Sequence, residues 1–143
     1  MQMKNAIRVT AAVIIEQGRV LATQRHERGA MGGKWEFPGG KIEPGVTPEA
    51  CLRRELREEL GVEADVQELF MRTAHAYPTK NVELFVFKAA IRAGSPVLHV
   101  HQDARWVSAA EIGGLDWLEA DQPIVAKLVK EEHVNCGCGE KRE

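Results

Sequence analysis

Features that would define several function classes are missing from this 143-residue sequence. The formal net charge of −2 shows no basic excess, which argues against binding to a nucleic acid backbone. No apolar run reaches the roughly 18 residues of a membrane span. The apolar stretch near the N-terminus is interrupted by Arg8 and has no convincing cleavage site. We therefore expect a cytoplasmic protein that binds neither nucleic acid nor membrane.

Cysteine is also scarce, with thiols only at Cys51, Cys136 and Cys138. An odd number of cysteines does not suggest a disulfide framework. The last two lie in "NCGCGEKRE", which could hold a soft metal but is more typical of a disordered tail. Because the chain is long enough for one core and too short for two, we expect one domain over 1–132 and a disordered tail over 133–143. The oligomeric state stays open between monomer and homodimer.

The order of apolar and turn residues predicts an α/β domain with a mixed sheet. A β-hairpin is expected around Gln17-Gly18, followed by a glycine-rich loop over 26–34. The remaining elements are expected to be a helix after Thr47, strands over 62–77 and 82–92 joined by "PTKN", a strand leading into a short helix over 104–112, and a last helix over 121–133.

The helix after Thr47 has clear boundaries and a clear buried side. Thr47 is a suitable N-cap residue and Gly61 a suitable stop signal. At about 100° per residue, a single stripe of leucines falls on one side of the helix. We expect this stripe to pack against the sheet: Leu52, Leu56 and Leu60.

A separate face beside that stripe carries Glu55, Glu58 and Glu59. A solvated helix face usually pairs opposite charges four residues apart, but here Glu55 faces Glu59. Such repulsion must be offset, and Mg²⁺ binds carboxylate oxygens together with phosphates. Ahead of the helix, Gly39 and Gly40 let the backbone approach a ligand and offer a carbonyl oxygen. The pattern favours a metal site over a solvated face.

This stretch resembles the Nudix box, G-x5-E-x7-R-E-U-x-E-E-x-G-U, where U is aliphatic. Beyond the box, the chain is similar to MutT-type nucleoside triphosphate pyrophosphohydrolases over about residues 6 to 130, including "EFPGGKIE" and "ADQPIVAKL". The resemblance implies the Nudix fold, an α/β/α sandwich with a mixed sheet. The box positions that match in register are Gly40, Arg54, Glu55, Leu56, Glu58, Glu59, Gly61 and Val62.

The resemblance also implies a reaction, in which Mg²⁺, or Mn²⁺ in its place, supports hydrolysis of a nucleoside triphosphate to monophosphate and pyrophosphate. The substrates implied are modified nucleotides such as 8-oxo-dGTP, or CTP and 5-methyl-dCTP, and the role is sanitation of the nucleotide pool. The metal ligands implied are Glu55, Glu58 and Glu59 with the Gly39 carbonyl, and Arg54 joins the glutamates as a catalytic residue. Metal ions neutralise the polyphosphate and activate water, so little covalent chemistry is left to the protein.

Val46 departs from the family's pattern. It stands where the family has the first Glu of the box, which commonly braces the box arginine, here Arg54. Glu43 is close in sequence but matches a different family position, so it is not an obvious substitute.

Val100 is a second departure, since it replaces a Glu that the family uses for metal binding or as a general base. In a strand, His99 and His101 would share one face, and such a pair is more often structural or solvent-facing than ligating. Two alternatives therefore stay open. One is a hydrolase of ADP-ribose or nucleotide sugars. The other is a nucleotide-binding module with reduced activity because of Val46 and Val100.

Several positions match substrate-binding positions of MutT-like proteins. Arg25 matches a cation that contacts the nucleotide, or is a plain surface arginine. Phe37 and Tyr77 match aromatic positions near the base, or belong to the core. Lys80 lies in the "PTKN" turn, where a basic residue is expected near the nucleotide.

Asp121 stands where MutT has an Asn. An ionised Asp only accepts hydrogen bonds, which favours a base with an exocyclic amine, such as cytosine or adenine. The alternative is that Asp121 only caps the last helix, in which Pro123 follows.

Overall fold

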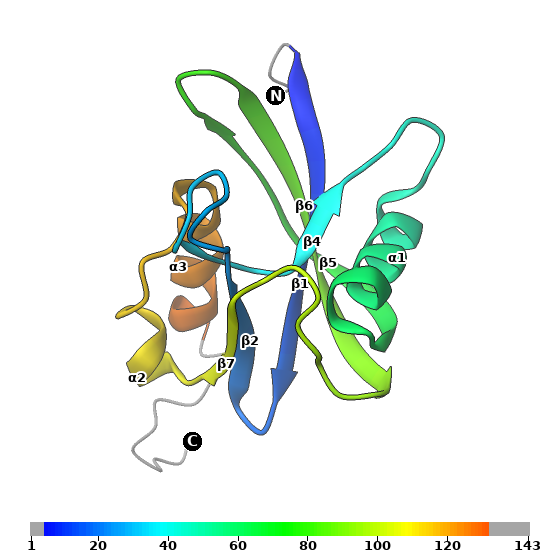
Figure 1. Ribbon diagram of the computed structural model, residues 1–143, viewed down its shortest axis with the longest axis vertical. Coiled ribbons are helices and arrows are strands. Elements are labelled where there is room, and N and C mark those ends of the chain that lie inside the picture. Colours follow the sequence, from blue (N-terminus) through cyan, green and yellow to red (C-terminus); the bar gives the residue numbers. More distant parts are fainter. Residues whose placement is uncertain (1–4, 132–143) are drawn as a thin grey trace.

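The computed structural model describes residues 5–131, and Figure 1 shows a sheet with helices on both sides. Cys136 and Cys138 of the expected tail lie outside the described residues. In chain order the elements are β1 (Ala6–Glu16), β2 (Arg19–Gln24), β3 (Trp35–Glu36), β4 (Gly39–Lys41), α1 (Pro48–Leu60), β5 (Glu63–Ala76), β6 (Asn81–Ala93), β7 (Asp103–Val107), α2 (Ala109–Ile112), the 3-10 helix η1 (Glu119–Asp121) and α3 (Gln122–Lys130).

The sheet is mixed, as the sequence predicts. β1 pairs in parallel with β6 along most of its length, while β5 with β6 and β7 with β2 are antiparallel. β1 and β2 pair only next to their turn, at Ile15 with Val20 and Glu16 with Arg19. Farther from the turn, β3 pairs with β2 and β4 with β1. The link between β3 and β4 therefore crosses from one half of the sheet to the other.

Alternation along the central strands supplies a core on each side of the sheet, because successive side chains of a strand point to opposite faces. In β1, Val13 belongs to the core beneath α3, and Ile14 belongs to the core beneath α1. In β6, Val86 and Phe87 divide in the same way. Figure 1 shows α1 on one side of the sheet and α2 with α3 on the other, which confirms the α/β/α sandwich.

α1 has the predicted boundaries and the predicted buried stripe. The Thr47 hydroxyl accepts a hydrogen bond from the Ala50 N–H at 3.1 Å. Gly61 ends the helix in the left-handed region, at φ 69°, where glycine is favoured. The stripe is fully buried at Leu52, Leu56 and Leu60.

One local expectation is wrong. Residues 99–101 form no strand, so His99 and His101 do not share a face. Backbone hydrogen bonds hold this segment instead, from Val97 N–H to the Leu60 carbonyl and from His99 N–H to the Glu59 carbonyl. As a result His99 is exposed, whereas His101 is buried.

No helix in residues 5–131 is long and apolar enough to cross a bilayer.

We expect Leu56→Ala to lower the free energy of unfolding by about 2–5 kcal/mol, because it removes a fully buried side chain and leaves a cavity. Arg53→Ala, on the exposed side of the same helix, should change it by less than about 0.5 kcal/mol. Urea titration of both variants measures the difference. Equal values would show that α1 is not held by its leucine stripe.

Candidate functional site

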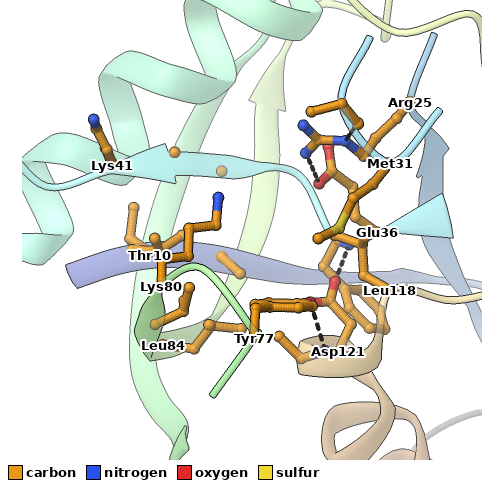
Figure 2. A pocket seen from close by; sticks show the side chains of 18 of the residues that line it. Thr10, Arg25, Met31, Glu36, Lys41, Tyr77, Lys80, Leu84, Leu118 and Asp121 are labelled. Atoms are coloured by element: carbon orange, nitrogen blue, oxygen red, sulfur yellow. Dashed lines mark hydrogen bonds and ion pairs between the residues drawn. The ribbon is translucent and has the colours of Figure 1, made fainter. Parts of the chain in front are cut away.

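A cavity of about 340 Å³ opens where the halves of the sheet separate (Figure 2). It is lined by all of the substrate-binding residues that the sequence predicts, although these come from different elements: Arg25, Phe37, Tyr77, Lys80 and Asp121. Gly39, Gly40 and Glu59 line the same cavity. The structure therefore brings the predicted base end and part of the carboxylate helix to one place.

Asp121 lies at one end of this cavity and is buried. Its carboxylate makes no capping hydrogen bond, so the reading of Asp121 as only a helix cap is wrong. It accepts instead from the Phe37 N–H at 2.9 Å. Burial raises the pKa of Asp121 to about 7, and the charge of Glu36 adds to the rise. Near neutral pH this carboxyl is therefore shared between its ionised and protonated forms.

The aromatic residues form two walls of the same end. Phe37 is buried and stacks on Trp117, with ring centroids 4.7 Å apart. Tyr77 is half-buried, and its hydroxyl accepts from the Ala120 N–H at 3.0 Å. Phe37 belongs to the core and also lines the cavity, whereas its position near a base stays a prediction. Lys80 is exposed and reaches the cavity from the turn after Tyr77.

Glu36 joins this end to the carboxylate helix, and the sequence reading missed it. One of its oxygens accepts from Arg25 Nη1 at 3.0 Å, as Figure 2 shows. The other lies 2.9 Å from His101 Nε2. The sequence contained one signal for Glu36, which is its position directly before Phe37-Pro38-Gly39. A carboxylate so close in sequence to a glycine turn lies near any site that the turn helps to form.

Glu59 is a half-buried carboxylate on α1. Burial, followed by the negative charges of Glu36 and Glu55, raises the pKa of Glu59 to about 9, although a backbone hydrogen bond from Gly39 acts in the opposite direction. Its Oε1 atom is buried without a hydrogen-bond partner. Such an orphaned oxygen is costly unless a ligand or ion supplies a partner.

The glycines at this point are required by close approach. A Cβ atom on Gly40 would lie 2.5 Å from the Glu55 carboxylate carbon. A Cβ atom on Gly39 would overlap the Thr10 carbonyl of the adjacent strand. The two glycines therefore let β4 fit between β1 and the glutamates of α1.

Arg54 is surrounded by carboxylates, which corrects the view of Glu43 as no obvious substitute. Arg54 lies 3.5 Å from Glu43, 3.4 Å from Glu55 and 3.8 Å from Glu58. Glu43 thus supplies Arg54 with a carboxylate partner, which the valine at position 46 cannot do. Glu58 remains largely in solvent, with a side chain that is 60% exposed.

A second cavity of about 350 Å³ adjoins the first and shares Arg25, Glu36 and Glu59 with it. Val100 lines this cavity together with His101 and is 57% exposed. Position 100 therefore lies close to the carboxylates, as the sequence comparison with the family suggested, but it supplies no oxygen.

Within residues 5–131, no three His, Cys, Asp or Glu side chains form a ready-made metal cluster. The donor set nevertheless fits a hard divalent cation, since carboxylate oxygens are its preferred ligands and the Glu59 oxygen lacks a partner.

Comparison with known proteins identifies a matching family and similar proteins. The sequence model of the protein family described as the NUDIX domain matches residues 10–127 of this chain. The chain is 34% identical over 131 residues to the 8-oxo-dGTP diphosphatase of Haemophilus influenzae, an alignment that covers 91% of this chain and 96% of that protein. It is 35% identical over 119 residues to the CTP pyrophosphohydrolase of Escherichia coli, covering 83% and 88%.

Solved structures agree with the fold. The solution structure of the E. coli ORF135 protein superimposes with a TM-score of 0.77 at 30% identity. The superposition covers 95% of this chain and 96% of that one.

The raised pKa of the half-buried Glu59 predicts a pH-dependent stability of the metal-free protein. Between its ordinary pKa of 4.5 and its folded value of about 9, the folded protein keeps a proton that the unfolded chain has lost. The free energy of unfolding should therefore fall as pH rises, by up to about 1.4 kcal/mol per pH unit. Asp121 contributes in the same sense only below about pH 7. Burial raises the pKa of the Cys51 thiol, so Cys51 contributes only near pH 9 and above, and Glu59 dominates the slope between these limits.

Denaturant titration in the presence of a chelator measures this slope. Glu59→Gln should flatten it between pH 7 and 9, because the amide does not titrate. Glu49→Gln, on the exposed first turn of α1, should keep the slope of the parent protein. A slope that survives in Glu59→Gln would assign the effect to another group.

Proposed function

This chain belongs to the NUDIX domain family and is a MutT-like pyrophosphohydrolase within it, and we propose that it hydrolyses nucleoside triphosphates to monophosphate and pyrophosphate. The observation that carries the proposal is the first cavity, which has Glu59 and the Gly39-Gly40 turn at one side and Asp121 at the other. A nucleotide needs these two environments together, one for its phosphates and one for its base.

Members of this family generally use divalent metal ions, and we propose Mg²⁺, with Mn²⁺ able to replace it. Glu55, Glu58 and Glu59 would hold the ion, and the Gly39 carbonyl would assist. When bound, it neutralises the phosphates and lowers the pKa of a water for attack on phosphorus. Such an ion would offset the repulsion among these glutamates and would supply a partner for the buried Glu59 oxygen.

Side chains around the ion hold its ligands and the nucleotide in place. Arg54 contacts Glu55 and Glu58 at once, so it fixes their orientation on the surface of α1. Arg25 points into the cavity from the end of β2 and offers a cation to the substrate. Lys80 offers a second cation from the opposite wall. Because phosphoryl transfer depends on positioning and charge, these roles are sufficient for the protein.

Asp121 and the rings of Phe37 and Tyr77 would select the base. The ionised carboxylate accepts from an exocyclic amine, as in cytosine, whereas the protonated form donates to a carbonyl. With a pKa of about 7, Asp121 is available in both forms. This supports CTP-type and 8-oxo-dGTP-type substrates in one pocket, and a role in sanitation of the nucleotide pool.

A second candidate is a nucleotide-binding module with little turnover. The observation that favours it is Val100, which places an apolar side chain beside Glu36 and Glu59 in the second cavity. Val46 adds to it only weakly, because Glu43 already reaches Arg54.

The decisive experiment is a substrate panel assayed for pyrophosphate release with Mg²⁺. CTP, 5-methyl-dCTP and 8-oxo-dGTP should be hydrolysed, whereas ADP-ribose and nucleotide sugars should not. Glu59→Gln should lower turnover at least about a hundredfold, since it removes a ligand charge. Glu49→Gln should leave turnover unchanged. Binding of triphosphates without hydrolysis would instead support the second candidate, and hydrolysis of ADP-ribose alone would refute the proposal.

Asp121→Asn should move the preference toward 8-oxo-dGTP, because the amide always carries a donor. In the parent protein, the ratio of kcat/KM for CTP over 8-oxo-dGTP should rise with pH through about 7, as the carboxyl ionises. The variant should lose this pH dependence, since an amide does not titrate. Steady-state kinetics at pH 6, 7 and 8 with both substrates measures it. An unchanged ratio in the variant would remove Asp121 from base selection.

A further inference from the structure

His101 is a buried polar residue that the proposed reaction does not use. Only 4% of its side chain is exposed. Its Nε2 atom lies 2.9 Å from a Glu36 oxygen, while its Nδ1 atom is buried without a partner. Since a carboxylate can only accept, Nε2 carries the proton and donates it to Glu36. The bare Nδ1 costs stability, and a buried group retained at such a cost calls for an explanation.

Glu36 receives a different donor on each oxygen. His101 donates to one oxygen, and Arg25 Nη1 donates to the other at 3.0 Å. A carboxylate fixed at both oxygens cannot rotate about its last bond. The Arg25 guanidinium is more exposed than its partners. Its Nε atom donates to the Ala30 carbonyl at 2.9 Å, and its Nη1 end is held by a chain of contacts that begins at the buried imidazole. Arg25 lines both cavities, and Figure 2 shows it joined to Glu36 at the cavity wall.

The segment that carries His101 does not depend on the imidazole for its position. Its backbone is tied to α1 through the His99 N–H and to β2 through the Gln102 N–H, which donates to the Gln24 carbonyl at 3.0 Å. The Gln102 side chain accepts from the Glu27 N–H at 2.9 Å. A change of the side chain at position 101 therefore leaves the segment in place and acts on Glu36 alone.

We infer that His101 is a positioning residue, which holds Arg25 for the incoming nucleotide through Glu36. The inference deepens the proposed function and rests on it for the identity of the ligand. It assigns no contact between His101 and substrate. Its signature is a loss in substrate binding that exceeds the loss in turnover, because Arg25 acts on the ground state and the transition state alike.

Three variants separate this role from simple packing. His101→Leu keeps the volume and removes the donor, whereas His101→Gln places an amide N–H about where Nε2 lies. His99→Leu, on the same segment but exposed, is the matched control. We expect His101→Leu to raise KM for CTP or 8-oxo-dGTP about tenfold or more, with kcat within about threefold. His101→Gln and His99→Leu should stay within about threefold of the parent in both constants.

A double-mutant cycle tests whether Arg25 is the target. In an Arg25→Ala background, His101→Leu should have little further effect on KM, since the residue that it positions is gone. Multiplicative effects of the two changes would overturn the inference. So would a failure of His101→Gln to restore KM, or a His101→Leu variant whose only defect is a lower melting temperature.

Nitrogen NMR of the Arg25 guanidinium gives a readout that needs no activity. The ion pair with Glu36 should hinder rotation, so the parent and His101→Gln should show separate Nη resonances. His101→Leu should show one averaged resonance. If the resonances stay separate in His101→Leu, the inference is wrong even in an active enzyme. The two proposals can fail separately. If the parent protein hydrolyses no triphosphate, the proposed function is refuted. If His101→Leu is still the variant that averages the Nη resonances, the positioning of Arg25 by His101 stands.

Discussion

The candidate site depends on carboxylates that lie close together in a half-buried region beside the C-terminal half of α1. Burial, followed by the charges of Glu36 and Glu55, raises the pKa of Glu59 there, and one of its oxygens has no hydrogen-bond partner. Their repulsion would be relieved by rotation into solvent, but the leucine stripe fixes one face of α1 against the sheet. The glycine turn fills the space in front of them. The protein thus keeps several carboxyl groups close together at a place where a divalent cation can bind them.

The divided sheet supplies the room for this corner. Because β1 and β2 pair only near their turn, the two halves of the sheet separate toward the other end. The link from Glu36 to Gly39 crosses the gap, and its Pro38 carbonyl accepts from the Ala12 N–H at 2.9 Å. One short segment therefore carries Glu36 toward Arg25, the Phe37 N–H toward Asp121, and Gly39 toward Glu59. The base end and the phosphate end are joined by the backbone itself.

Polar groups around the cavity reduce stability in favour of function. The Glu59 oxygen and His101 Nδ1 are both buried without partners, and Asp121 is buried with a pKa near neutrality. Each would be replaced by an apolar residue in a protein selected only for folding. Among the described residues, the buried side-chain atoms without a hydrogen-bond partner belong to Thr10, Glu59 and His101. All three residues line the two cavities, which is the physical mark of a site.

The sequence by itself determined α1, its caps, its buried leucines and its glutamate face, because these follow from helical periodicity and from residues near in the chain. It also determined the longer strands, since their alternation is local, but not the short strands β3 and β4, which form only through pairing with β2 and β1. Only the tertiary structure decided the roles of Glu36, His101 and Glu43, because each depends on a partner distant in sequence: Glu36 meets His101 across 65 positions. Distance in sequence also explains why the sequence could not decide between the two roles of Asp121, as a helix cap or as part of the cavity wall. A capping pattern is visible in the chain, whereas the Phe37 N–H that actually binds this carboxylate is brought to it by folding.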